Sequence, residues 1–320
     1  MKLIITIDTE EDNWAHYRTT DNPVENIEKI VQLQALFDRF EVKPTYLVTY
    51  PVATNPRSVA ILKAILDAGK CEIGTHCHPW NTPPFEEEIS ERNSMLCNLP
   101  EDLVYRKLEC LHEVISNNFD VLPVSFRAGR WGFGSSVARS LARLGYLVDS
   151  SVSPYVDWSV YHGPDFSAFP LRPYRFDLDD ILTPRADGAL LEIPATVGFL
   201  QGDFARCQKW TKACETNISK KFHLKGILSR VGLLENAWLS PEQSNSKTMI
   251  RLARHIEKMK LPCLNMSFHS TSLVAGLSPF VRDWEDERIF LQNIKELLIH
   301  ASKSDWTAVL IKEMDVARDS

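Results

Sequence analysis

Two histidines stand two residues apart, His76 and His78, in the stretch Glu72–Trp80 (EIGTHCHPW), where the sequence predicts the end of a strand. In an extended segment residues i and i+2 point to the same side, so the two imidazoles can converge on one point. Two neutral imidazoles and a carboxylate, with open positions for water, suit Zn²⁺ or another divalent first-row metal. The alternative is that one histidine caps a loop while the other hydrogen-bonds the backbone.

A pair of carboxylates follows the first apolar run of the chain, in the stretch TIDTEED at residues 6–12. Asp8 and Glu10 would face the same direction while the chain stays extended. One carboxylate could bind a metal while the other takes a proton from water that the metal activates. An acidic turn with exposed carboxylates is the competing interpretation. The sequence leaves open whether Asp12 joins or replaces Glu10 as a ligand.

Three further polar residues lie within or just after apolar runs: Arg127, Glu192 and His269. A buried guanidinium requires a carboxylate partner, so Arg127 could hold Asp8 ionised and orient it, or it could form a purely structural ion pair. A buried Glu192 needs an arginine or a histidine as its partner. His269 is either a satisfied core histidine or a reactive residue in the polar company of the serines and threonine that follow it.

Several neighbours of these motifs allow a structural or a functional interpretation. Cys77 lies between the two histidines and would point to the opposite side of the strand, so we expect it to be packed rather than to bind a metal. Trp14, Trp80 and Trp131 follow three of the motifs. Aromatic faces beside a polar site suit carbohydrate rings, although such residues are equally common as core anchors.

The composition is that of an ordinary globular protein and narrows the function classes. The chain has 320 residues, of which 44% are hydrophobic and 24% charged, and its net charge is −6. This length suits one large domain or two small ones. The mild acidity argues against a nucleic-acid-binding protein, which would show a basic face. No apolar run approaches the ~20 residues of a membrane span. The composition does not indicate an oligomeric state.

The start of the chain and its cysteines predict a cellular compartment. Met1-Lys2 leads straight into the run LIITID, without the longer apolar core and cleavage site of a signal peptide. The seven cysteines are odd in number and scattered, which suggests a reducing compartment rather than a disulfide framework. We therefore expect a cytoplasmic protein.

Short apolar, β-branched runs alternate with helical patterns along the chain. Several of these runs are apolar nearly throughout, as parallel strands buried on both faces should be. Strands alternating with helices predict an α/β fold, a (β/α) barrel of seven or eight parallel strands that is either complete or else distorted or incompletely closed. The predicted strands are residues 3–7, 44–50, 71–76, 125–129, 146–151, 189–196, 263–269 and 307–314.

Helix start signals stand between the strands. Asn22-Pro23 predicts a helix that runs to about residue 40, and Asn55-Pro56 predicts the next one. Residues 240–243 (SPEQ) have the form of a capping box with proline at the first helical position. A helix near residues 285–302 has an apolar stripe that should face the core.

The remaining segments are expected to be additions to one domain that covers residues 1–320. Residues 152–188 are rich in proline, aspartate and aromatic residues, which predicts a long loop excursion. Residues near 200–240 have a helical pattern and predict a helical insertion, either a lid or a flank.

The candidate residues share one property, because each group follows or ends a predicted strand. In a (β/α) barrel the chemistry takes place on the loops after the C-terminal ends of the strands. Five such groups on five strands at one rim are hard to attribute to chance. In chain order they are TIDTEED, EIGTHCHPW, FRAGRWG, LEIP and SFHSTS.

This order of motifs resembles that of the polysaccharide deacetylase family, the NodB-homology domain of carbohydrate esterase family 4. That family has an acidic pair, a histidine pair, an arginine motif, an acidic-proline motif and a late histidine in the same order. The matching stretches span residue 3 to about residue 272. Here Thr9 separates the two acids, the histidines are two rather than four apart, the arginine motif lacks its proline, and Glu192 replaces an aspartate. The chain resembles a divergent subgroup associated with lipopolysaccharide or surface-glycan synthesis.

The resemblance implies a role for each matching residue. The metal ligands of the family correspond to Glu10, His76 and His78. The catalytic base, the arginine that positions it, the acidic partner of the arginine-histidine machinery and the general acid correspond, in chain order, to Asp8, Arg127, Glu192 and His269.

The implied reaction is metal-dependent removal of an acetyl group from an N-acetylated sugar of a glycan, glycolipid or surface-polysaccharide precursor, with Zn²⁺ as the favoured divalent ion. Asp8 would take a proton from the attacking water, and His269 would protonate the departing amine, supported by a carboxylate such as Glu192. The metal and a backbone N–H of the Arg130-Trp131 turn would stabilise the oxyanion. The alternatives are an O-acetyl esterase or non-sugar amide hydrolase on the same fold, and an inactive glycan-binding protein.

Overall fold

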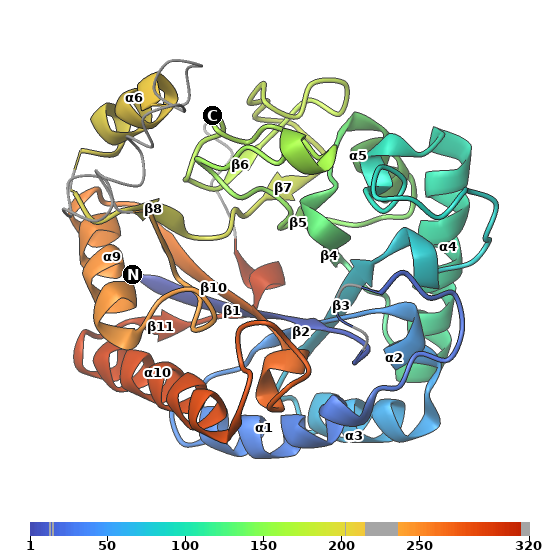
Figure 1. The fold of residues 1–320 in the computed structure, drawn as a ribbon, viewed down its shortest axis with the longest axis horizontal. Helices are drawn as coiled ribbons and strands as arrows, with labels where there is room; N and C mark the ends of the chain where they lie inside the picture. Colours follow the sequence, from blue (N-terminus) through green and yellow to red (C-terminus); the bar gives the residue numbers. More distant parts are fainter. Residues whose placement is uncertain (13, 15, 202, 215–235, 315–320) are drawn as a thin grey trace.

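The computed structural model describes residues 1–12, 14, 16–201, 203–214 and 236–314. Its centre is a curled sheet in which seven parallel strands follow the spatial order β10-β1-β2-β3-β4-β5-β7, surrounded by helices (Figure 1). The predicted α/β fold of the (β/α) barrel type is confirmed. The seven strands are β1 (Lys2–Thr9), β2 (Thr45–Val48), β3 (Glu72–Cys77), β4 (Ser125–Ala128), β5 (Val148–Asp149), β7 (Leu191–Glu192) and β10 (Cys263–His269).

Two more strands extend this sheet. β11 (Thr307–Ala308) runs parallel to β1 and pairs with its first residues, Lys2 and Leu3, whereas β2 pairs with the later residues 6–9 of β1. β6 (Tyr174–Arg175) pairs antiparallel with β7 at the end of the sheet. With β11 included, a strand is present at each of the eight predicted places, although several of the strands are shorter than predicted.

The two ends of the parallel series, β7 and β10, are joined by a few hydrogen bonds rather than by a strand ladder among the described residues. The Thr196 N–H donates to the Asn265 carbonyl at 3.2 Å, and the Asn265 N–H donates to the Thr196 hydroxyl at 2.8 Å. The Asn265 amide group also donates to the carbonyls of Ile193 and Pro194, each at 3.3 Å. The barrel is therefore incompletely closed, which is one of the two forms that the sequence allows.

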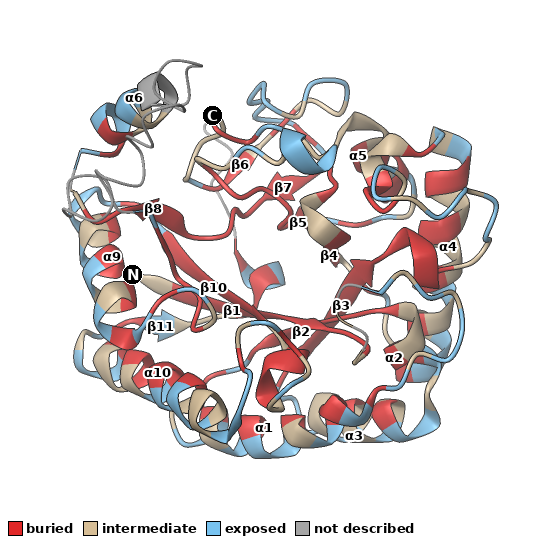
Figure 2. Cartoon of the chain, in the orientation of Figure 1, coloured by how far each residue is buried: buried red, intermediate tan, exposed pale blue. Residues whose placement is uncertain are grey.

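The helices cover the sheet with their apolar sides. In Figure 2 the central strands are mainly buried, whereas β11 is exposed and the helices are buried on the side facing the sheet and exposed on the other. A helix that packs against a sheet needs such a one-sided apolar stripe. The helices of this layer are α1 (Ile30–Asp38), α2 (Tyr50–Thr54), α3 (Pro56–Asp67), α4 (Glu101–Phe119), α5 (Ser135–Arg143), α9 (Ser246–Lys258) and α10 (Trp284–Lys303).

Two of the predicted helix starts are confirmed and two begin later than predicted. Asn55 caps α3 by accepting the N–H groups of Arg57 and Ser58, and α10 begins within a residue of its prediction. The segment after Asn22-Pro23 starts as a 3₁₀ helix at residues 25–29 before α1 begins. Residues 240–243 form a turn instead of a capping box, because Asn245 caps α9 by accepting the Thr248 N–H.

The segments between the later strands are mainly irregular. Residues 152–188 contain the short 3₁₀ helix Ser159–Tyr161 and the strand β6 within a long stretch of loop. The region near 200–240 holds α6 (Phe204–Cys214), and β8 (Val197–Phe199) pairs antiparallel with β9 (Asn236–Trp238). Residues 215–235, the rest of the predicted helical insertion, lie outside the described residues. No helix among the described residues is both long and apolar enough to cross a membrane.

Candidate active site

The strand register brings the predicted site residues to one end of the sheet. Asp8 in β1 lies beside His269 at the end of β10, and His76 in β3 lies beside Arg127 in β4. These residues line a cleft of about 460 Å³, a size typical of small-molecule sites. The position at the C-terminal ends of the parallel strands is where barrel enzymes carry their chemistry.

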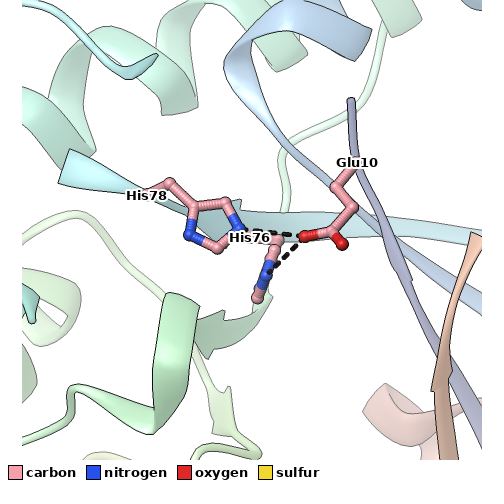
Figure 3. Close-up of side chains that lie close together, drawn as sticks. All are labelled: Glu10, His76 and His78. Carbon is pink, nitrogen blue, oxygen red and sulfur yellow. Dashed lines mark hydrogen bonds and ion pairs between the residues drawn. The ribbon is translucent and has the colours of Figure 1, made fainter. Parts of the chain in front are cut away.

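Glu10, His76 and His78 form a buried cluster that could hold a metal ion (Figure 3). One ligand atom from each residue lies within 4.8 Å of the others. The Glu10 Oε2 atom is 3.0 Å from His78 Nε2 and 3.9 Å from His76 Nε2. The two histidines come from the end of β3, and the carboxylate comes from the residue after β1. Side chains almost seventy positions apart in the sequence thus meet at one point.

The nitrogen atoms of both rings are oriented by the surrounding backbone. His76 Nδ1 lies 3.0 Å from the Arg127 carbonyl oxygen, so Nδ1 carries the proton and Nε2 is left with a lone pair facing Glu10. His78 Nδ1 is buried without a hydrogen-bond partner among the described residues and lies against Gly129. In both rings the ligand atom is therefore Nε2, and the backbone contact fixes the ring.

Burial sets the protonation of this cluster. It lowers the pKa of His76 and of His78 to about 4, so each ring is neutral and offers a lone pair. It also raises the pKa of Glu10 to about 7. A divalent cation among these atoms would stabilise the ionised carboxylate and so oppose the effect of burial. Two neutral imidazoles and one carboxylate with open positions fit a divalent ion of the Zn²⁺ type.

Asp8 is held as a carboxylate by Arg127, which is only 1% exposed. The guanidinium donates to Asp8 Oδ1 at 2.8 Å, and its other N–H groups donate to Thr6 and Ser150 at 2.7 to 2.9 Å. Burial alone would raise the pKa of Asp8, but the positive charges of Arg127 and of neighbouring histidines outweigh it and lower the pKa to about 2. Asp8 is thus ionised and fixed in orientation.

His269 lies between two carboxylates. Its Nδ1 is 3.0 Å from Glu242 Oε2, and its Nε2 is 3.7 Å from Asp8 Oδ2. Burial would lower the pKa of His269, but the Glu242 carboxylate, with help from Glu10 and Asp8, raises it to about 10. The ring is therefore an imidazolium that can donate a proton from Nε2 on the side of the cleft where Asp8 lies.

Glu192 does not supply the carboxylate that supports His269, and the sequence-based expectation is corrected here. Glu192 is fully buried in β7, where its Oε1 accepts the Val152 N–H at 3.1 Å. The ladder between β5 and β7 places it beside Asp149 rather than beside the histidine. Burial and the Asp149 carboxylate raise the pKa of Glu192 well above its usual range, so one proton is retained by this pair.

Two other residues of the motifs lie outside the metal cluster. Asp12 accepts the N–H groups of Glu25 and Asn26 at 2.8 and 3.2 Å, so it caps the first helical segment. The candidate cluster contains Glu10 and not Asp12, which favours Glu10 as the carboxylate ligand. Cys77 is buried in the hydrophobic core, as its position between the histidines predicts.

Aromatic rings form much of the cleft wall. The three tryptophans that follow the motifs all line it: Trp14 lies 4.7 Å from the His269 ring, Trp80 lies 4.2 Å from the His78 ring, and Trp131 lies over the Arg127 guanidinium at 5.4 Å. The first two distances join ring centres, and the third joins the Trp131 ring centre to the guanidinium carbon. Two further tryptophans of the wall lie near Trp131: Trp158 and Trp238.

Gly129 allows the His78 ring to lie directly against the backbone. A Cβ atom at this position would be 2.3 Å from His78 Nδ1 and 2.8 Å from the Cys77 carbonyl oxygen. We expect Gly129→Ala to displace the ring and to lower the affinity for Zn²⁺ by roughly 10- to 100-fold, as does the loss of a group that orients a ligand. Zinc titration of the metal-free protein measures the change.

The matched control for this substitution is Gly134→Ala, a few residues along the same loop. A Cβ at Gly134 would meet only Cys97 Cβ, at 3.3 Å, and should leave the zinc affinity as it is in the parent protein. Equal zinc affinity for the two variants would show that the position of the His78 ring does not matter for metal binding.

The curled sheet and the cluster at its rim define the class of the protein as a (β/α) barrel with a potential metal site. No protein-family model and no curated protein matches the sequence. Solved structures match it over almost its full length. A Mycobacterium smegmatis protein described as a polysaccharide deacetylase is 16% identical, with 98% of this chain and 94% of that chain covered and a TM-score of 0.50.

A second solved structure, from Parabacteroides distasonis, is described as a glycoside hydrolase/deacetylase. It is 12% identical, with 97% of this chain and 69% of that chain covered and a TM-score of 0.59. At these identities the comparison establishes the fold, so the chain has the fold of the polysaccharide deacetylases. The (β/α) barrel expected from the alternation of strands and helices is observed, in an open form.

Sequence patterns did not select one residue of the site, Glu242. Its surroundings, SPEQ, have the form of a helix start and predict one. In the structure the Glu242 carboxylate accepts hydrogen bonds from both the ring and the backbone N–H of His269. A signal was present all the same. Glu242 follows the short apolar run Ala237–Leu239, and so an acidic residue follows a strand here as it does after β1.

Proposed function

We propose that the protein is a metal-dependent hydrolase that removes the acetyl group from an N-acetylated sugar. The observation that carries this proposal is the meeting of three functions in one cleft. They are a ligand set for a divalent ion, an ionised carboxylate on Asp8, and an imidazolium on His269 whose Nε2 lies 3.7 Å from Asp8 Oδ2. Amide hydrolysis needs a base for the water, an acid for the departing amine and a site for the oxyanion.

The chain provides the proton transfers with its own residues. A divalent ion held by Glu10, His76 and His78 would supply Lewis acidity to the acetyl carbonyl and to the attacking water. Asp8 accepts a proton of that water while Arg127 holds it in position. His269 donates its Nε2 proton to the departing nitrogen, and acetate and a free amine leave. The short separation between the two groups lets Asp8 return its proton to His269 for the next turnover.

The turn at Gly129–Trp131 provides a candidate hydrogen-bond donor for the oxyanion. Arg130 and Trp131 have φ angles of +54° and +61°, in the left-handed region that is uncommon for non-glycine residues. Both carry a backbone N–H group in a turn that borders the cleft. We assign one of these N–H groups, as the sequence suggested, to the oxyanion of the acetyl carbonyl.

The cleft supports a carbohydrate as the substrate. Its wall of tryptophan rings suits the apolar faces of sugar rings, and its volume of about 460 Å³ suits a few sugar units. The description of the M. smegmatis structure as a polysaccharide deacetylase agrees with this choice. We propose Zn²⁺ as the ion, a cytoplasmic location, and a precursor of lipopolysaccharide or another surface glycan as the substrate.

Acetate release is the direct test of this function. N-acetylglucosamine oligosaccharides, the same sugars carrying O-acetyl groups, and a simple N-acetyl amide without a sugar should be compared with zinc-loaded protein. We expect acetate from the N-acetyl sugars at a rate that exceeds the other two. Preference for the O-acetyl sugars or for the sugar-free amide would establish one of the alternative hydrolases. Absence of release from all three would favour an inactive glycan-binding protein.

The metal itself can be tested without an activity assay. Protein purified without chelator should contain about one divalent ion per chain by elemental analysis, and the His76→Ala variant should contain almost none, because three protein ligands are needed to hold the ion. His300→Ala is the matched control, since His300 lies on α10 and hydrogen-bonds Ser304. If neither the parent nor His76→Ala binds metal, or if both bind it equally, the ligand assignment is incorrect.

A further inference from the structure

Arg130 differs from the other positive groups that line the cleft. The guanidinium of Arg127 is buried and donates to Asp8, Thr6 and Ser150, and the His269 ring is engaged by carboxylates on both sides. The hydrogen bonds of Arg130 to described residues go to two neutral hydroxyl groups, those of Tyr17 and Ser94. A positive charge therefore lines the cleft with neutral groups as its hydrogen-bond partners among the described residues.

The described carboxylate that pairs with Arg130 is half exposed, so solvent weakens this ion pair. Glu91 Oε1 lies 3.6 Å from Nη2, and half of the Glu91 side chain is exposed. Exposed pairs at such distances contribute little. Nε and Nη2 of Arg130 make no hydrogen bond to a described residue, and about a quarter of the side chain is exposed. The planar fork of a guanidinium with free N–H groups is suited to a carboxylate or a phosphate.

Tyr17 provides a second donor at the same place. Its hydroxyl oxygen accepts from Arg130, so its own proton is free, and no described residue accepts that proton. The Tyr17 ring contacts Trp80 in a tilted arrangement at 4.9 Å between centres, and Trp80 contacts His78 in the same way at 4.2 Å. Two ring contacts thus connect the pair of donors with a ligand of the candidate metal site.

The backbone holds Arg130 in this position. The residue has a positive φ angle, which a side chain such as arginine adopts at an energetic cost, and the turn lies between β4 and the rest of the cleft wall. Arg130 also follows Gly129, which contacts His78, so the guanidinium and the metal cluster are fixed to the same short turn.

We propose that Arg130 and Tyr17 bind an anionic group, a carboxylate or a phosphate, carried by the same sugar whose acetyl group is removed. The inference rests on the proposed function and names the substrate class more closely, as an acidic or phosphorylated N-acetylated sugar. Arg130 is a specificity-determining residue in this account. A guanidinium and a hydroxyl group can bind a carboxylate or a phosphate through the same hydrogen bonds. Probes that carry one or the other group distinguish the two.

Binding calorimetry in the zinc-loaded Asp8→Asn background tests the proposal without turnover. The probes are N-acetylglucosamine, its 6-phosphate, its 1-phosphate and its 6-carboxylate. We expect at least one charged probe to bind roughly 10- to 100-fold more tightly than the neutral sugar, as loss or gain of charge-assisted hydrogen bonds should produce. In Arg130→Gln this ratio should fall towards one, whereas Arg130→Lys should keep part of it.

Two more variants make the result specific. Tyr17→Phe keeps the ring on Trp80 and should lower the ratio by a smaller factor, about 3- to 10-fold, because one neutral donor is lost. Arg106→Gln removes an exposed arginine of α4, which pairs with Glu86, and should leave the ratio as it is in the parent. Thermal melting of every variant shows whether it is folded.

The outcomes separate this inference from the proposed function. If no charged probe binds more tightly than the neutral sugar, or if the ratio survives in Arg130→Gln, the anion site is overturned even when acetate is released. If the ratio is present and is lost in Arg130→Gln while no acetyl sugar is hydrolysed by the parent protein, the anion site stands and the proposed hydrolysis fails. A preference for the phosphates that persists in Arg130→Gln would place the anion on the metal instead.

Discussion

The Asp8→Asn variant should release acetate roughly 10²- to 10⁴-fold more slowly than the parent protein while it still binds one divalent ion per chain. The size of the effect is that of removing a positioned general base. Asparagine has nearly the same shape and can still accept a hydrogen bond from Arg127 through its amide oxygen, but it cannot accept a proton from water. The kcat of acetate release and elemental analysis of the same sample measure the two parts of the prediction.

Asp8→Ala is the informative partner of this variant. It removes the acceptor as well as the charge and leaves the buried Arg127 guanidinium without a carboxylate, which should lower the free energy of unfolding by about 3–5 kcal/mol. Asp8→Asn should be affected less. If Asp8→Asn loses its metal, Asp8 is a ligand rather than the base. If it keeps activity within tenfold of the parent, the base lies elsewhere.

Arg127 explains why three carboxyl groups can be buried near the centre of the barrel. Asp8 takes the close ion pair with Arg127, whereas Asp149 and Glu192 lie together with a retained proton. A second ionised carboxylate in that pair would be a buried charge with no close cation, because the guanidinium is already engaged. Because Glu192 is neutral, it does not compete with Asp8 for the positive charge of Arg127.

The strands were predictable from sequence because burial on both faces leaves a simple pattern. Parallel strands such as β1, with its run LIITI, are mainly apolar, and short apolar runs between helical segments are typical of such strands. The irregular closure beside Asn265 was expected only in outline. Hydrogen bonds made by one side chain with the backbone leave no periodic signal in a sequence.

The site was predictable where spacing along one strand decides which side a residue faces. His76 and His78 meet Glu10 because both follow the period of two, and the ends of neighbouring parallel strands meet at one edge. Which strands are neighbours in the sheet was harder to predict from the sequence. Glu192 was expected to support His269, but β5 and β7 are neighbours in the sheet. This pairing places Glu192 beside Asp149. Glu242 reaches His269 from a turn, for which no spacing rule exists.

The Glu242→Gln variant should lose activity at alkaline pH and keep it at lower pH. The pKa of His269 is raised above its ordinary value, so the ring is charged at neutral pH and loses its proton only as the pH rises through about 10. Glutamine removes the largest of the influences that raise this pKa and leaves burial, which lowers it. The high-pH limb of the kcat profile should therefore move by two or more pH units towards the acid side, so activity at pH 8.5 should fall by about fourfold or more.

Stability gives a second, independent measure of the same pair. A histidine whose pKa is raised by folding stabilises the folded protein fully below the pKa of the unfolded state, and the stabilisation is lost as the pH rises through the folded value. Urea unfolding should thus show the largest difference between the parent and Glu242→Gln near pH 6 and the smallest above pH 10. A defect in packing alone would lower the stability by the same amount at both pH values.

Glu192→Gln is the control that decides which carboxylate supports the acid. Because Glu192 retains a proton and lies beside Asp149, replacing it with a neutral amide should leave the high-pH limb of kcat where it is in the parent. If the limb moves in Glu192→Gln and stays in Glu242→Gln, the assignment from sequence is restored and the contact between Glu242 and His269 has no catalytic importance. If it moves in neither, His269 is not the acid, since no proton donor paired with Glu242 could be insensitive to the loss of that charge.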